Sequence, residues 1–162
     1  MNNPRQNLIR ILQNAHAGEL AAAFAYRGHW KSLRESAEKT QIKKIEAEEW
    51  AHRANVQKWL EELGAKPNDR REKIFWTIGK TIGAACYISG WFFPMYFAGR
   101  LESQNVQEYV AAAEFARELK MPECAEEMME LSLTEQEHED FFRQTVANHR
   151  LLPITRKIFR WS

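Results

Sequence analysis

The chain has 162 residues and carries 23 basic against 22 acidic side chains, so its formal net charge at pH 7 is +1. This length suits one domain with a substantial core, and the near-neutral balance gives no reason to expect a nucleic-acid partner. Two cysteines, Cys86 and Cys124, make no disulfide framework, and the N-terminus lacks an apolar signal-like stretch. We therefore expect a cytoplasmic protein with reduced thiols.

Apolar residues recur at three-and-four spacing along most of the chain, which predicts an all-α fold. We expect four helices, at about residues 5–31, 36–63, 97–119 and 123–148. The first turn lies in the polar stretch 32–38, where Ser36 is a candidate N-cap. Gly64 and Pro67 end the second helix, and Pro122 breaks the chain between the last two. We expect a connection over 65–96, a basic tail over 153–162, and one domain over residues 1–162.

The connection turns strongly apolar towards its end, because residues 81–99 contain no charged side chain. This segment has three interpretations: a membrane-spanning helix broken by Pro94, a core or dimer-interface helix, or an interfacial helix. In the last, aromatic side chains dip into lipid: Trp91, Phe92, Phe93, Tyr96 and Phe97. Basic residues on both sides favour peripheral contact with the inner face of the cell membrane: Arg70, Arg71, Lys73, Lys80, Arg156, Lys157 and Arg160.

One pattern of acidic and imidazole side chains occurs twice along the four helices. Glu19 precedes the motif Glu49-x-x-His52, and Glu102 precedes the motif Glu135-x-x-His138. A lone Glu from each of two helices plus a Glu-x-x-His from each of the other two is the ligand set of a carboxylate-bridged dinuclear metal site in a four-helix bundle.

The positions of the predicted turns support this interpretation. Residue 34, midway between Glu19 and Glu49, falls inside the polar stretch 32–38, and the midpoint of Glu102 and Glu135 falls a few residues before Pro122. Two antiparallel helices bring residues to the same level when these lie equally far from the turn. Each hairpin therefore aligns its lone Glu with its Glu-x-x-His motif.

The spacing of each motif also suggests a role for each ligand. Residues three apart share a helix face, so Glu49 and Glu135 can bridge two metals while His52 and His138 each bind one. Glu19 and Glu102 would then be terminal ligands. Four carboxylates buried without cations repel one another, whereas two divalent ions neutralise them. Oxygen and imidazole donors without thiolate suit two iron ions (Fe²⁺/Fe³⁺), with manganese as the alternative.

Further residues lie close to these ligands along the helices. Tyr26 and Tyr109 each follow a lone Glu by seven residues, two helical turns, so they either contact the site or pack in an ordinary core. His16 and His29 lie on the helix of Glu19, and a role in the site stays open for both. Five other glutamates are either solvated or support the ligands: Glu46, Glu48, Glu108, Glu137 and Glu139.

Over about residues 8–145 the chain resembles the demethoxyubiquinone hydroxylases, di-iron monooxygenases of ubiquinone biosynthesis in the ferritin-like superfamily. The likeness is carried by His16-Ala-Gly-Glu19 with Tyr26 two turns on, the first Glu-x-x-His, Leu101-Glu102, and Glu135-Gln-Glu-His138 followed by Glu139-Asp140. The chain differs from the family after Glu102, where a His-Tyr-Asn cluster is missing, and after Glu19, where a glycine is missing.

The resemblance implies a ferritin-like four-helix bundle with a long apolar crossover helix between helices 2 and 3. It implies an O₂-dependent di-iron monooxygenase that hydroxylates the ring of a hydrophobic quinone with electrons from an external donor. It is also compatible with peripheral membrane contact and with a homo-oligomer. The alternative is a ferritin-like or rubrerythrin-like protein that handles iron or peroxide without an organic substrate. A metal-free helical interaction module would require the six aligned ligands to be coincidence.

Overall fold

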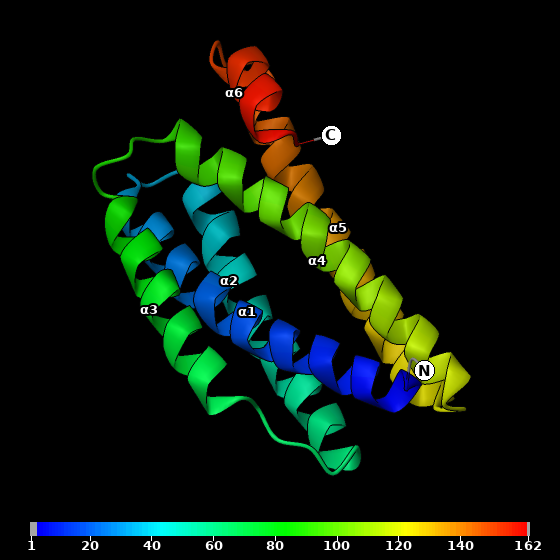
Figure 1. Ribbon diagram of the computed structural model, residues 1–162. Helices are drawn as coiled ribbons and strands as arrows, with labels where there is room; N and C mark the ends of the chain where they lie inside the picture. The colour runs from blue at the N-terminus through cyan, green and yellow to red at the C-terminus, as the bar shows by residue number, and fades with distance from the viewer. Residues whose placement is uncertain (1–2, 162) are drawn as a thin grey trace.

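The computed structural model describes residues 3–161, and within them the chain forms six α-helices and no strand. The helices are α1 (Pro4–Ser32), α2 (Ala37–Glu62), α3 (Asp69–Ala85), α4 (Phe92–Glu118), α5 (Pro122–Val146) and α6 (Leu152–Phe159) (Figure 1). The all-α prediction is confirmed for this part of the chain. Residues 1–2 and 162, the ends of the predicted domain and tail, lie outside it.

Side-chain caps and prolines set several helix boundaries. The side chain of Asn3 accepts a hydrogen bond from the backbone N–H of Arg5 at 3.1 Å at the start of α1. Ser36 accepts from the N–H of Lys39 at 3.2 Å before α2, as predicted, and Asn68 accepts from Arg71 at 3.0 Å before α3. Gly64 follows α2 with φ +62°, a left-handed conformation that glycine adopts without strain.

Two prolines lie in the first turns of two helices, of which one begins earlier than predicted and the other was not predicted as a helix. The third predicted helix was expected from about residue 97, but α4 begins at Phe92 and includes Pro94. The tail was expected only as a basic segment, but Pro153 is the second residue of α6. Proline is tolerated in the first turn because the N–H it lacks has no helical partner there. Both prolines therefore start helices instead of separating segments.

Two buried apolar clusters hold α1, α2, α4 and α5 together, and each cluster takes residues from all four helices. One contains Leu8, Leu12, Val56, Leu60, Tyr109, Ala112, Cys124 and Met128. The other contains Tyr26, Ile42, Ile45, Met95, Tyr96, Phe142 and Val146. Along each helix the predicted ligands fall between the residues of the two clusters. A polar layer is therefore enclosed between two apolar ones.

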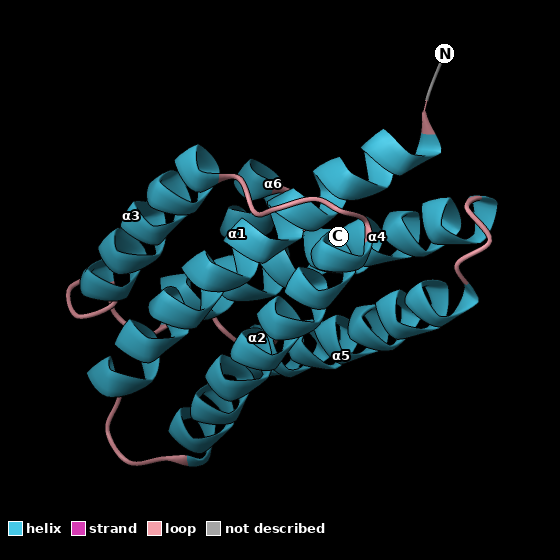
Figure 2. Cartoon of the chain, turned by 90° about the horizontal axis from the view of Figure 1, so that it is seen from below, coloured by secondary structure: helices cyan, strands magenta, loops and turns pink. Residues whose placement is uncertain are grey.

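The helix α3 lies alongside α1, as both ribbon views show (Figures 1 and 2). The two backbones touch, because Gly79 packs on Ala21 and Gly83 packs on Gly28 and Phe24. At the start of α3, Glu72 accepts from His16 Nδ1 at 2.7 Å and from Arg53 at 2.7 Å, which ties α3 to α1 and α2. His16 therefore holds helices together and lies outside the group of predicted ligands.

The apolar segment 81–99 is not one helix, so the membrane-spanning interpretation is wrong. It comprises the end of α3, the connecting turn and the start of α4. Within residues 3–161 no helix combines the length and the apolar character that crossing a bilayer requires. The expectation that five aromatic side chains dip into lipid is also wrong for Phe92 and Tyr96, which are 4% and 0% exposed in the core.

The C-terminal residues fold back onto α4 and α5. The indole of Trp161 donates to Glu139 at 2.9 Å and packs against Gly99. The ring centroids of Phe159 and Phe97 lie 5.0 Å apart. Arg100 on α4 donates to the carbonyl of Phe159 at 2.8 Å. The predicted basic tail is thus packed against the start of α4.

Replacing Gly28 by alanine tests the contact between α1 and α3. A Cβ at this position would overlap the Cα and carbonyl of Gly83, so we expect Gly28→Ala to destabilise the protein by about 1–3 kcal/mol, as overpacking does. Gly18→Ala is the matched control, because a Cβ there meets nothing within 4 Å. We expect it to be neutral or stabilising by about 0.5–1 kcal/mol. Denaturant unfolding measures both, and equal effects would contradict the close contact.

Candidate metal centre

All six predicted ligands come together in the polar layer between the apolar clusters. None of them exposes more than 4% of its surface: Glu19, Glu49, His52, Glu102, Glu135 and His138. Charged side chains are almost never this buried unless they are paired or bind metal. The α1–α2 hairpin supplies three of the six, and the α4–α5 hairpin supplies the other three.

The six side chains form two overlapping groups of four. One group is Glu19, Glu49, His52 and Glu135, and the other is Glu49, Glu102, Glu135 and His138. In each group one ligand atom per residue lies within 4.8 Å of all the others. Glu49 and Glu135 belong to both groups, so each group has one His, one Glu of its own and two shared carboxylates. This buried cluster can hold a metal ion.

Several oxygen and nitrogen atoms of this cluster have no hydrogen-bond partner among the described residues. They are both carboxylate oxygens of Glu49, Oε2 of Glu19 and Nδ1 of His138. Buried polar atoms are nearly always paired. His138 Nδ1 lies 3.4 Å from Glu49 Oε1, so these lone pairs converge on a common space. The donor set therefore fits a cation.

The pKa values of the glutamates show the cost of this arrangement without a cation. Burial raises the pKa of Glu19, Glu49 and Glu102, and the charges of neighbouring carboxylates raise it further. Burial acts in the same direction on Glu135, but the neighbouring imidazoles of His138 and His52 hold its pKa below the ordinary value. His52 Nδ1 lies 2.8 Å from Glu135. Ionising all four carboxylates is therefore unfavourable without a cation, and bound cations would remove this cost.

Two tyrosines link the helices of the two hairpins. Tyr26 on α1 donates its hydroxyl hydrogen bond to Glu102 on α4, and Tyr109 on α4 donates to Glu19 on α1. The sequence placed each tyrosine on the face of the glutamate of its own helix, but its partner is the glutamate of the opposite helix. Both tyrosines also belong to the apolar clusters, so the packing and the site-contact interpretations hold together.

Two polar residues support the ligands from outside. Asn105 donates to Glu102 Oε2 at 2.9 Å and to Glu135 Oε2 at 3.4 Å. Glu48 pairs with Nε2 of His138 at 3.1 Å and so turns Nδ1 of that ring towards the cluster. The sequence left the role of Glu48 undecided and did not identify Asn105 as a supporting residue. The position of Asn105, three residues after Glu102 on the same helix face, could have indicated that role.

The remaining candidates lie outside the ligand cluster. Glu46 accepts from Arg27 at 2.7 Å and from Trp30 at 2.6 Å, and Glu139 accepts from Trp161. Glu137 is exposed on α5. His29 is buried further along α1, beyond Tyr26.

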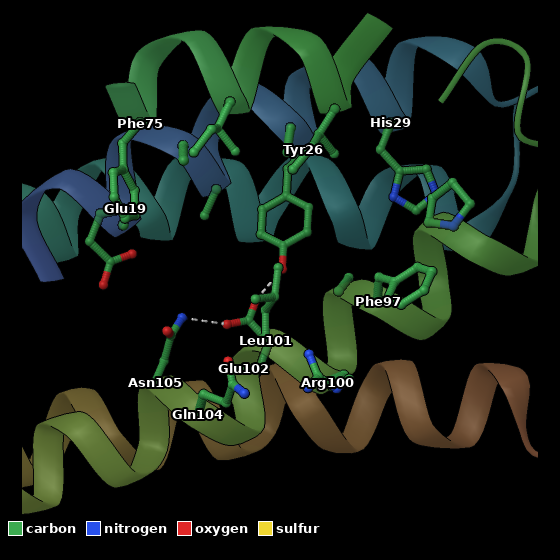
Figure 3. A pocket seen from close by; sticks show the side chains of 18 of the residues that line it. Glu19, Tyr26, His29, Phe75, Phe97, Arg100, Leu101, Glu102, Gln104 and Asn105 are labelled. Atoms are coloured by element: carbon green, nitrogen blue, oxygen red, sulfur yellow. Dashed lines mark hydrogen bonds between the residues drawn. The ribbon is translucent and has the colours of Figure 1, made fainter. Parts of the chain in front are cut away.

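A pocket of about 720 Å³ opens onto the cluster between α1, α3 and α4. Small residues of α1 form its floor, among them Gly18, Ala22 and Ala25. Figure 3 shows Glu19, Tyr26, Glu102 and Asn105 on its polar side and Phe75 and Phe97 among its apolar walls. Its rim carries exposed apolar side chains, Ile78, Ile82, Phe93 and Leu101. An apolar ligand can reach the glutamates from this side.

Removing one shared carboxylate tests metal binding. After anaerobic loading with Fe²⁺ we expect about two ions per wild-type chain, measured by elemental analysis. Glu49→Gln should lose both, because Glu49 belongs to both groups, whereas Glu19→Gln should weaken one. Glu137→Gln is the matched control on an exposed position and should keep wild-type stoichiometry. Undiminished iron in Glu49→Gln would contradict the shared role of this residue.

Comparison with known proteins agrees with this geometry. The model of the family described as ubiquinone biosynthesis protein COQ7 matches residues 6–111. No curated protein and no solved structure matches the chain. The matched segment includes Glu19, Glu49, His52 and Glu102, while Glu135 and His138 lie beyond it and join the cluster through the fold. Because the match covers more than half of the 162 residues, the chain belongs to the COQ7 family of ubiquinone biosynthesis proteins.

Proposed function

We propose that this protein is an O₂-dependent di-iron monooxygenase that hydroxylates a quinone ring in ubiquinone biosynthesis. The observation that carries the proposal is the pair of four-ligand groups sharing Glu49 and Glu135, beside an apolar pocket. Family membership supports the pathway. The ligand set supports the metal, since carboxylate and imidazole donors without thiolate suit iron.

The proposed scaffold is a single ferritin-like four-helix bundle formed by α1, α2, α4 and α5, with α3 in the crossover between α2 and α4. Each apolar cluster takes residues from these four helices, which supports the bundle. In the bundle the two Glu-x-x-His motifs lie on α2 and α5 and the lone glutamates on α1 and α4, as in known di-iron carboxylate proteins.

Bound iron would supply the activation of O₂, one atom entering the ring and the other leaving as water at the expense of two electrons from an external donor. The chain itself holds the ligands in place. The hydroxyl of Tyr109 binds one oxygen of Glu19 and leaves the other without a partner, free for a metal. Glu102 accepts from Tyr26 at one oxygen and from Asn105 at the other, which orients its carboxylate. Glu48 fixes the ring of His138, and the apolar clusters exclude water from both ends of the layer.

The pocket supports an organic substrate over the iron- or peroxide-handling alternative. Its volume lies in the range of sites that bury ligands of moderate size, and its floor and walls are mostly apolar. An iron or peroxide handler needs only a path for small polar species. The lining with Ile78, Ile82, Phe93 and Phe97 suits a ring with a long hydrophobic side chain.

Filling the pocket floor tests substrate turnover separately from metal binding. With ¹⁸O₂, a reductant and a quinone that lacks the ring hydroxyl, we expect the iron-loaded protein to form a product carrying one ¹⁸O atom, detected by mass spectrometry. Ala22→Phe should keep the iron and lower turnover about tenfold or more, because Ala22 lines the pocket. Ala54→Phe, on an exposed position of α2, is the matched control.

The outcome also decides between the two candidate functions. Iron oxidation or peroxide consumption at equal rates with and without the quinone, and no oxygenated product, would favour the iron- or peroxide-handling function. Equal product from wild type and Ala22→Phe would contradict the pocket as the substrate site.

We also propose that the rim of the pocket rests on a lipid surface, as a peripheral contact on the inner face of the cell membrane. Ile88 is 89% exposed in the turn after α3, and Ile82, Phe93 and Tyr87 are exposed beside it. The α6 helix, whose Phe159 packs on Phe97 in the pocket lining, also exposes Ile154 and Ile158 and carries Arg156 and Lys157. Exposed apolar patches with basic neighbours favour binding to anionic bilayers.

Vesicle flotation tests this surface. The wild type should float with vesicles that contain anionic phospholipid, and Ile88→Asp combined with Phe93→Asp should remain in the soluble fraction, because two charges would enter the apolar layer. Leu133→Asp is the matched control, since Leu133 is 63% exposed on α5. Failure of the wild type to float, together with dimerisation lost in the double variant, would assign the surface to a second copy of the chain.

A further inference from the structure

The cluster of candidate metal ligands can be approached from two sides of the bundle. On one side is the pocket between α1, α3 and α4, which Glu19 and Glu102 line. The other four candidate ligands, which α2 and α5 supply, are not among the described residues that line this pocket. The pocket therefore accounts for access to the terminal glutamates but not for access to the shared carboxylates and the histidines.

The second side is the surface between α2 and α5, here called the α2–α5 seam. These two helices pack far less closely than the helices within each hairpin do. The side chain of Glu48 on α2 is 28% exposed, and its Oε2 lies 3.1 Å from Nε2 of His138. Nδ1 of the same ring lies 3.4 Å from Glu49, whose two oxygens have no hydrogen-bond partner within residues 3–161. A chain of polar groups thus leads from solvent to a shared carboxylate.

The pocket is a poor route for a hydrated cation. Its rim carries exposed apolar side chains, among them Ile82 and Phe93, and a divalent ion that loses water there gains no ligand in return. Glu108 is the exposed carboxylate among the pocket residues, but within residues 3–161 no hydrogen bond joins it to a candidate ligand. Glu48 combines exposure to solvent with direct contact to a ligand, so the α2–α5 seam suits a cation better.

Lys44 covers Glu48 from the solvent side. Its Nζ lies 3.0 Å from Oε1 of Glu48, and its side chain is 61% exposed. An ion pair this exposed is weak because water screens it, so a divalent cation can displace the ammonium group. Oε1 is then free for the cation while Oε2 stays on the ring of His138.

We propose that Glu48 is the entry ligand of the metal centre: it takes up Fe²⁺ from solvent at the α2–α5 seam and passes it to His138 and Glu49. Metal and organic substrate then reach the cluster from different sides. This inference rests on the metal centre of the proposed function. Glu48 acts on the rate of uptake, because a negative charge at an entrance raises the rate at which a cation is captured.

The rate of metal uptake tests the proposal. Metal-free protein is mixed anaerobically with Co²⁺, whose visible absorption reports binding in a stopped-flow instrument, and elemental analysis gives the final stoichiometry. We expect Glu48→Gln to slow uptake about fivefold to tenfold. Its final metal content should stay near that of the wild type, because the amide oxygen can still accept from His138. Lys44→Gln should quicken uptake, because Oε1 of Glu48 loses its partner.

The α2–α5 seam offers a matched control pair further along the two helices. Glu127 on α5 accepts from Lys58 at 3.0 Å and from Trp59 at 2.8 Å on α2. Glu127→Gln and Lys58→Gln should therefore keep the wild-type rate of uptake. Two changes in the pocket, Ala22→Phe and Glu108→Gln, should keep it as well.

The outcomes separate this inference from the proposed function. An unchanged rate of uptake in Glu48→Gln, with metal that only dissociates faster, would overturn the proposal and leave Glu48 with the orientation of His138 alone. Slower uptake in Ala22→Phe or Glu108→Gln would also overturn it, because the pocket would then be the entrance. If the wild type binds neither Co²⁺ nor Fe²⁺, the proposed metal centre itself fails and this inference fails with it.

Discussion

Repulsion among four buried carboxylates is the constraint on which the rest of this structure depends. Glu19, Glu49, Glu102 and Glu135 are each at most 2% exposed, and burying their charges together is unfavourable without cations. The chain nevertheless encloses them between two apolar clusters that hold the four helices in register. A packed core of this kind fixes the spacing of the candidate ligands, so that the same side chains that oppose folding of the metal-free protein form a preorganised cluster that can hold a metal ion.

The two hairpins are interdependent because each completes the ligands of the other. Tyr109 on α4 holds Glu19 on α1, and Tyr26 on α1 holds Glu102 on α4. Glu48 of the first hairpin orients His138 of the second. Neither hairpin alone contains the hydrogen-bond partners of all its own candidate ligands. Metal binding and the association of the hairpins are therefore expected to be linked, since ions that bind only the assembled site stabilise it.

The sequence predicted features that depend on helix geometry and missed features that depend on how helices meet. The i, i+3 motifs and the hairpin midpoints brought the six ligands to one level, because the helical period is nearly invariant. The partners of Tyr26 and Tyr109 required knowledge of which helices are neighbours. Composition identified residues 81–99 as apolar but did not tell which of their side chains face the core and which face the solvent. Burial in the fold distinguishes the core residue Tyr96 from the exposed Ile88. The sequence pattern indicated breaks at Pro94 and Pro153, because proline is compatible both with a break and with the first turn of a helix.

The helix α3 forms a wall of the pocket and takes no part in the core. Within residues 3–161 neither apolar cluster contains a residue of α3, and α3 packs chiefly against α1. Gly79 and Gly83 bring its backbone against α1, and Glu72 anchors its first turn to His16 and Arg53. With α3 held this close to α1, its side chains Phe75, Ile78 and Ile82 face those of α4 across the pocket. The residues that position α3 thus determine the shape of the pocket without belonging to the cluster of candidate metal ligands, so on the proposed function the choice of substrate could change in this fold while the ligand cluster stays the same.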